Sequence, residues 1–183
     1  NTFARCTSLE KITVDSENPN FSSDSFGVLF NREKTTLIKY PEANSLTVYT
    51  IPDSVTTIDA NSFLCAAKLT EIIIPDGVTT IEESAFKECF NLKTVEIPAS
   101  VTTIKNQVFN NCVMLEKIVI PDGITTIGTQ MFYYCGQLKE IIIPESVTSV
   151  GKQAFTSCSS LKDVYFKGTQ QQWSAISVAN NNQ

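Results

Sequence analysis

The feature that most constrains this chain is a 23-residue repeat that runs through most of its length. Six leucines recur at that interval, namely Leu46, Leu69, Leu92, Leu115, Leu138 and Leu161. Five phenylalanines have the same spacing, namely Phe63, Phe86, Phe109, Phe132 and Phe155. A fixed period in this range is typical of a solenoid, in which each repeat forms one coil and buries its apolar edge against its neighbours.

Each repeat begins with a segment that predicts a short β-strand. Residues 69–74 (LTEIII) are rich in β-branched side chains and are followed by a proline, which suits the exit of a strand. The alternation predicts that Ile72 and Ile74 face the interior, whereas Glu71 and Ile73 face outward. Strands of successive coils are expected to lie side by side and parallel, about 4.8 Å apart.

The rest of each repeat predicts a second extended piece and a turn. Residues 78–81 (VTTI) form the extended piece. In residues 82–89 (EESAFKEC), Ala85, Phe86 and Cys89 are spaced by one and three residues, which suits a helical turn that faces the core.

The consensus of the copies is L-x-x-I-x-I-P-x-x-V-T-T-I-x-x-x-A-F-x-x-C-x-x, and it resembles the BspA-like leucine-rich repeats of bacterial surface proteins. The resemblance covers residues 46–166 almost without a gap, and residues 3–14 as a partial copy. It implies a repeat solenoid of the α/β type, wound as a right-handed coil, with a parallel β-sheet on the concave face and short strands and helical turns elsewhere. It also implies an extracellular or cell-surface location on a bacterium.

We expect one domain over residues 1–183, divided into four parts. They are a partial repeat at 1–14, a modified repeat with a hairpin insert at 15–45, regular repeats at 46–166 and a capping segment at 167–183. The hairpin is predicted by GVLF and TLIKY around the polar turn NREKT. In the capping segment, Thr169 and Gln172 form a capping-box pattern, which predicts a helix. The chain opens inside a repeat without an initiator methionine, so we expect it to be a piece of a larger protein.

Composition excludes several classes of function. The net charge of -5 disfavours a nucleic-acid partner, which needs a basic face. The chain has no histidine, so Ser-His-Asp and Cys-His catalytic sites are impossible. No apolar run is long enough to span a bilayer. We therefore expect neither an enzyme nor a bound cofactor or metal, and no membrane insertion by this segment.

Five of the six cysteines fall in one column of the repeat, and the sixth, Cys65, lies one place early. The five are Cys6, Cys89, Cys112, Cys135 and Cys158. Zinc sites need closely paired ligands, and these intervals are 23 residues or more. The pattern predicts small buried side chains that pack in a tight turn, with disulfides between neighbouring coils as the alternative.

The outward positions of the first strand form the candidate binding face. Its residues are Glu71, Ile73, Thr94, Glu96, Lys117, Val119, Glu140, Ile142, Asp163 and Tyr165. The column that ends at Tyr165 is mostly apolar. Strand propensity alone explains such a column, and so does a protein-binding face with tyrosine as its anchor. Glu140 and Asp163 fall on adjacent strands, where two carboxylates could hold a cation or act as an acid/base pair.

These observations favour a non-catalytic interaction or adhesion scaffold that binds a protein on a host or a neighbouring cell through the strand face. Two alternatives stay open. One is a carbohydrate-binding or carbohydrate-active solenoid that uses Glu140 and Asp163. The other is a passive spacer between other domains.

Overall fold

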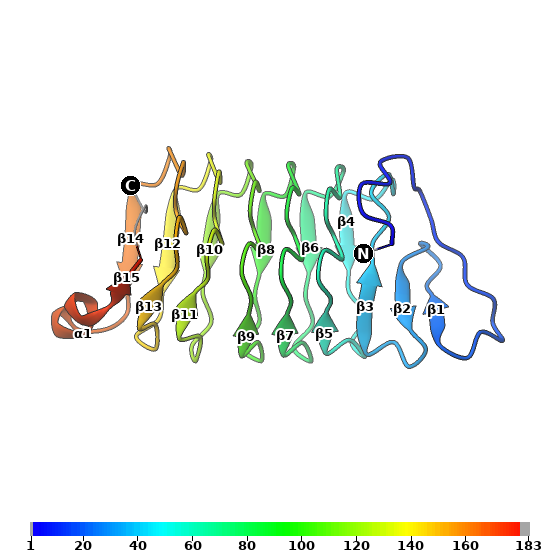
Figure 1. The fold of residues 1–183 in the computed structure, drawn as a ribbon, viewed down its shortest axis with the longest axis horizontal. Coiled ribbons are helices and arrows are strands. Elements are labelled where there is room, and N and C mark those ends of the chain that lie inside the picture. The colour runs from blue at the N-terminus through cyan, green and yellow to red at the C-terminus, as the bar shows by residue number, and fades with distance from the viewer. Residues whose placement is uncertain (1, 180–183) are drawn as a thin grey trace.

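The computed structural model describes residues 2–179, which form a single stack of coils (Figure 1). Two columns of short strands run along the stack, and we call one coil of the stack a rung. The first column contains β4 (Val48–Thr50), β6 (Glu71–Ile73), β8 (Thr94–Glu96), β10 (Lys117–Val119), β12 (Glu140–Ile143) and β14 (Asp163–Phe166). The second contains β3 (Thr36–Lys39), β5 (Thr57–Ile58), β7 (Thr80–Ile81), β9 (Thr103–Ile104), β11 (Thr126–Ile127), β13 (Ser149–Val150) and β15 (Ser177–Val178).

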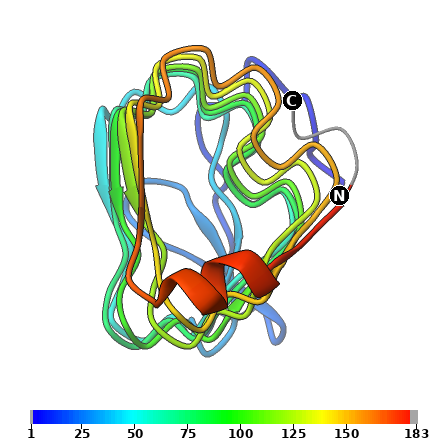
Figure 2. The same cartoon turned by 90° about the vertical axis from the view of Figure 1, so that its left-hand side faces the viewer.

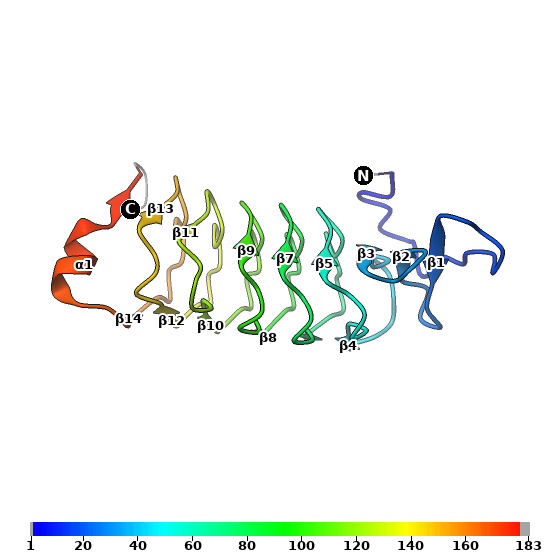
Figure 3. The same cartoon turned by 90° about the horizontal axis from the view of Figure 1, so that it is seen from below.

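The two columns lie on different sides of the stack, and the core fills the space between them (Figure 3). In the first column the sheets are β4-β6-β8 and β10-β12-β14, all parallel. Glu71 is opposite Thr94, and Lys117 is opposite Glu140, so one 23-residue repeat advances the chain by one rung. The predicted parallel solenoid is thereby confirmed.

Side chains along each strand alternate as expected between core and solvent. In β6, Ile72 is buried while Glu71 and Ile73 on either side of it are exposed. The column of phenylalanines forms an aromatic stack through the interior. The distances between successive ring centroids are 5.2 Å for Phe63 and Phe86 and 5.5 Å for Phe86 and Phe109. Because each ring contacts the ring of the next rung, the core is closed only between neighbours.

The segment around each phenylalanine consists of consecutive tight turns and not of a helix. In one rung, the Ala85 and Lys87 N–H groups donate to carbonyls three residues back, as a helical turn would. The alternate N–H groups of Ser84, Phe86 and Glu88 instead donate to carbonyls of the next rung, at 2.8–3.0 Å. The hydrogen-bonding potential is thus divided between the rung itself and its neighbour, which is why no helix propagates here.

The cysteine column lies inside these turns. Cys89, Cys112 and Cys135 are buried, and each thiol donates to the carbonyl oxygen of the phenylalanine 26 residues earlier, with Sγ···O distances of 3.1–3.2 Å. Burial raises the pKa of the Cys89 thiol to about 12. These three cysteines are packing residues, as predicted, and each also ties one rung to the previous one. Cys158 is only partly buried and Cys6 is exposed, so the predicted burial is wrong for Cys6, which lies at the N-terminal end of the described chain.

At the N-terminal end, β1 (Phe21–Ser23), β2 (Leu29–Asn31) and β3 form an antiparallel meander, and β3 continues parallel to β5. The pair of β2 and β3 stands where the sequence predicts a hairpin. The division of the chain into four segments stays a prediction.

At the C-terminal end, the helix α1 (Gln170–Ala175) lies across the open end of the stack (Figure 2). Its capping box is formed by Thr169 and Gln172, as predicted. The predicted capping segment extends to residue 183, and residues 180–183 lie outside the described part. No helix within residues 2–179 is long and apolar enough to cross a membrane.

Candidate binding face

The outward side chains of the first strand column form what we call the strand face. The register aligns its ten predicted residues in two columns that run along the stack. Glu71 and Thr94 are adjacent in the first, followed by Lys117, Glu140 and Asp163; Ile73 and Glu96 are adjacent in the second, followed by Val119, Ile142 and Tyr165. A backbone hydrogen bond from Glu116 N–H to the Lys93 carbonyl (3.3 Å) continues the stack between β8 and β10.

The second of these columns exposes apolar side chains on a regular surface. Ile73 is 44% exposed, Val119 41% and Tyr165 63%. Ile142 is half-buried, and Glu96 interrupts the column. Val48, on the first rung of the face, adds a further exposed aliphatic side chain in the other column. Water-exposed apolar groups in a row are what a partner can bury.

Two ion pairs join neighbouring rungs on the face or directly beside it. Lys117 Nζ lies 2.7 Å from Glu140 Oε1, and Lys139 Nζ lies 2.8 Å from Glu116 Oε2. The hydrogen bond and charge of Lys139 lower the pKa of Glu116. Exposed pairs of this kind contribute little to stability because solvent screens them, so their main effect is to fix the charge pattern around the apolar column.

Glu140 and Asp163 lie directly opposite each other on β12 and β14, as the sequence predicts. However, the Glu140 carboxylate already has the Lys117 ammonium as its partner. Within residues 2–179, no group of three or more acidic or cysteine side chains is arranged to hold a metal ion. The pair therefore has the spacing of a carboxylate site without the converging groups that such a site needs.

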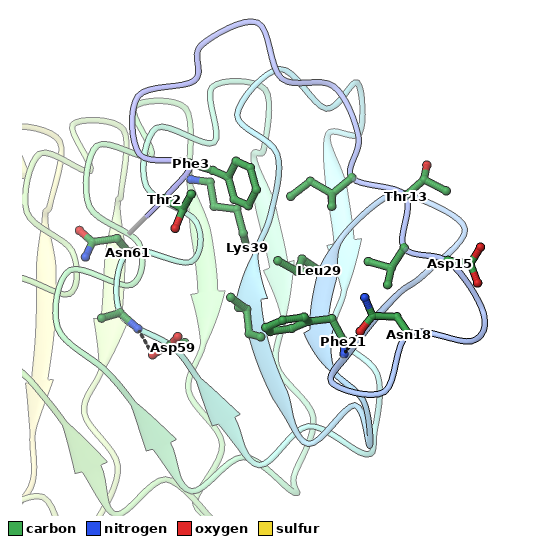
Figure 4. A pocket seen from close by; sticks show the side chains of 14 residues that line it. Thr2, Phe3, Thr13, Asp15, Asn18, Phe21, Leu29, Lys39, Asp59 and Asn61 are labelled. Carbon is green, nitrogen blue, oxygen red and sulfur yellow. Dashed lines mark hydrogen bonds between the residues drawn. The ribbon is translucent and has the colours of Figure 1, made fainter.

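Two features were missed by the sequence analysis, and both lie near the hairpin. One is a cavity of about 660 Å³ between the N-terminal segment and β1 to β3 (Figure 4). The other is the buried ion pair of Lys39 and Glu42, with Nζ and Oε1 3.3 Å apart. The sequence gives only a weak signal for the cavity. Leu29 and Ile38 are apolar and stand next to core residues in the sequence, so the hairpin strands have no clear polar side.

Short parallel strands in register, an aromatic stack and a thiol column repeated every rung define a β-solenoid repeat protein. Comparison of the sequence with known families gives the particular class: the BspA type leucine rich repeat region matches in six copies over residues 39–162. The chain belongs to this family.

Solved structures of bacterial proteins share the fold. A leucine rich cell surface protein from Faecalibacterium prausnitzii is 35% identical with a TM-score of 0.90, over 97% of this chain and 47% of that one. A leucine-rich repeat protein from Eubacterium ventriosum is 29% identical with a TM-score of 0.81, over 90% and 44%. The pneumococcal vaccine antigen PcpA is 26% identical with a TM-score of 0.82, over 91% and 41%.

This chain spans less than half the length of each of these three structures. No curated protein matches the sequence.

Proposed function

We propose that this protein is a non-catalytic interaction scaffold, exposed on or secreted from a bacterial cell, that binds a protein partner through the strand face. The observation that carries the proposal is the exposed apolar column of Ile73, Val119, Ile142 and Tyr165, bordered by paired charges. The similarity to a bacterial cell surface protein supports the location.

The mechanism follows from the rigidity of the stack. The inner strands of the face have a neighbour on both sides, and β14, which carries Tyr165, is hydrogen-bonded to β12, so the side chains are already ordered before a partner arrives. Binding then costs little conformational entropy. An exposed column of aliphatic groups, interrupted by Glu96 and ending at a tyrosine, offers an anchor and apolar groups around it that a partner can bury, which is the usual anatomy of a protein-binding site.

The test uses two substitutions on the face and two matched controls elsewhere. Tyr165→Ala and Ile142→Asp remove the anchor and the apolar column. Tyr134 is 48% exposed and Phe90 43% exposed, and neither belongs to the strand face, so Tyr134→Ala and Phe90→Asp are equivalent changes off the face. Binding is measured by surface plasmon resonance against a panel of extracellular matrix and host-cell surface proteins.

For a partner found in that panel, we expect each face variant to weaken binding at least tenfold, because truncation of an anchor residue commonly costs more than about 1.4 kcal/mol. The control variants should bind within twofold of the parent chain, and all four should keep its circular dichroism spectrum. Equal binding by the face variants and the parent would exclude the strand face as the binding surface.

A further inference from the structure

The cavity beside the hairpin has the size and lining of a ligand site. Its volume of about 660 Å³ lies within the range of about 300–1,000 Å³ that small-ligand sites occupy. Apolar side chains make up most of the wall, from the N-terminal segment on one side and the hairpin strands on the other: Phe3, Ile12, Val14, Phe21, Leu29 and Ile38. Figure 4 shows Phe3, Phe21 and Leu29 around the same space.

The N-terminal wall of the cavity is held in place by hydrogen bonds to the stack. Arg5 N–H donates to Glu42 Oε1 (2.8 Å), Ile12 N–H to the Gly27 carbonyl (2.9 Å) and Val14 N–H to Ser23 Oγ (3.1 Å). Gly27 permits this approach, because a Cβ there would lie 2.3 Å from the Cβ of Lys11. The cavity is therefore preformed, and a ligand would not have to order its walls.

The charges at the cavity are negative. Asp15 and Asp59 line it and lie on opposite sides of the apolar side chains (Figure 4). Asp15 Oδ1 accepts a hydrogen bond from the backbone N–H of Glu17, and Asp59 Oδ1 accepts one from the backbone N–H of Ala60, both with an N···O distance of 2.8 Å. Neither aspartate is in an ion pair within residues 2–179.

The lysine of the lining does not offset these charges. The Lys39 side chain is 1% exposed, and its ammonium is used by Glu42 and by the Leu64 carbonyl. An anionic ligand would meet repulsion at both ends, whereas a cationic one would be attracted.

We propose that this cavity binds an extended peptide segment of a partner protein, in which an apolar core is flanked by a basic residue on each side. The apolar walls would take up the aliphatic or aromatic side chains, and the two aspartates would pair with the flanking ammonium or guanidinium groups. The excess of acidic residues in the chain, with a net charge of -5, attracts such a segment from solution. This site is separate from the strand face and does not depend on it.

The proposal is tested with two synthetic peptides and the whole chain. The peptides are acetyl-Lys-Leu-Phe-Leu-Lys-amide and its acidic counterpart, acetyl-Glu-Leu-Phe-Leu-Glu-amide. Amide chemical shifts and affinities are followed by NMR titration at low and high salt. We expect the basic peptide to shift the amides of residues 12–15, 29 and 59–61, to bind at least tenfold tighter than the acidic one, and to weaken as salt is added.

Variants separate the apolar contribution from the charged one. Phe21→Ser, at a half-exposed side chain that should tolerate change, is expected to weaken the basic peptide at least fivefold. The double change Asp15→Asn and Asp59→Asn should remove most of the difference between the two peptides, while Asp76→Asn, an exposed aspartate outside the cavity, should leave it unchanged.

Three results would overturn the proposal. They are no shift at these amides with millimolar basic peptide, equal affinity for both peptides, and an unchanged preference in the double aspartate variant. Tyr165→Ala serves as a further control, because loss of the strand face should not alter binding in the cavity.

Discussion

At the scale of single residues, the turns contain a repeated backbone feature that no glycine supplies. Two positions in each turn, two residues before and two after the phenylalanine, have left-handed φ. In one rung they are Ser84 (φ 58°) and Glu88 (φ 60°), and in the last they are Gln153 (φ 56°) and Ser157 (φ 63°). This conformation costs an L-residue roughly 1–2 kcal/mol, and in the inner rungs it accompanies the hydrogen bonds from alternate N–H groups to the next rung.

A glycine at such a position should therefore stabilise the protein. Ser157 is exposed, so Ser157→Gly changes little else, and we expect the free energy of unfolding to rise by about 0.5–1 kcal/mol in urea titrations. Ser160 has no left-handed φ, so Ser160→Gly should lower it. If both variants were destabilised alike, the turn geometry described above would be wrong.

At the scale of elements, the buried thiol column should make the free energy of unfolding fall as the pH rises into the alkaline range. Burial raises the pKa of Cys89 to about 12 and that of Cys158 to about 11, and it raises the pKa values of Cys112 and Cys135 well above the usual range. A thiol in the unfolded chain ionises near pH 8.5, about its reference value. Above that pH the unfolded state releases protons that the folded state keeps, so folding is progressively disfavoured until the folded pKa is reached.

Each buried thiol should thus lower the free energy of unfolding by about 1.4 kcal/mol per pH unit between roughly pH 8.5 and its folded pKa. Urea titrations at pH 8, 9 and 10 under reducing conditions measure this slope. Cys89→Ala should reduce the fall of the free energy of unfolding with pH by the contribution of one thiol. Cys6→Ala, at an exposed cysteine, should leave the fall unchanged. A slope that neither substitution alters would contradict the burial of the column.

The elements differ in how far the sequence predicts them. The strands were predictable because inward and outward residues such as Ile72 and Ile73 alternate within one short segment. The turns were not, because their geometry depends on hydrogen bonds to the next rung, and left-handed positions filled by Ser, Gln and Asn carry no glycine signal. A local helical pattern and a tight turn place Phe86 and Cys89 on the core side equally well.

Of the two candidate sites, one could be predicted from the sequence and the other could not. The columns of the strand face follow from the period alone, since a 23-residue step fixes which residues are neighbours across strands. The cavity could not be predicted, because it is formed where residues 2–18 lie against β1 to β3 and residues 59–61, and no periodic pattern encodes that contact.

At the scale of the whole molecule, the stack has an interior that belongs to no rung alone. The aromatic rings, the thiols and the alternate backbone N–H groups all find their partners one rung away. The last rung shows what happens without a full neighbour: Val164 is 47% exposed, although the equivalent Ile141 of the previous rung is buried. Stability should therefore be close to a sum over rungs and the interfaces between them.

Deletion of one complete rung tests this account most directly. Removal of residues 92–114 joins Asn91 to Leu115 and keeps every column in register, whereas removal of residues 92–103 shifts the columns that follow. In urea titrations we expect the first variant to keep one cooperative transition, with lower stability and a smaller m-value because less surface is exposed on unfolding, and the second to lose it. Loss of the cooperative transition in both variants, or its survival in both, would contradict the claim that each repeat is one interchangeable rung of a single stack.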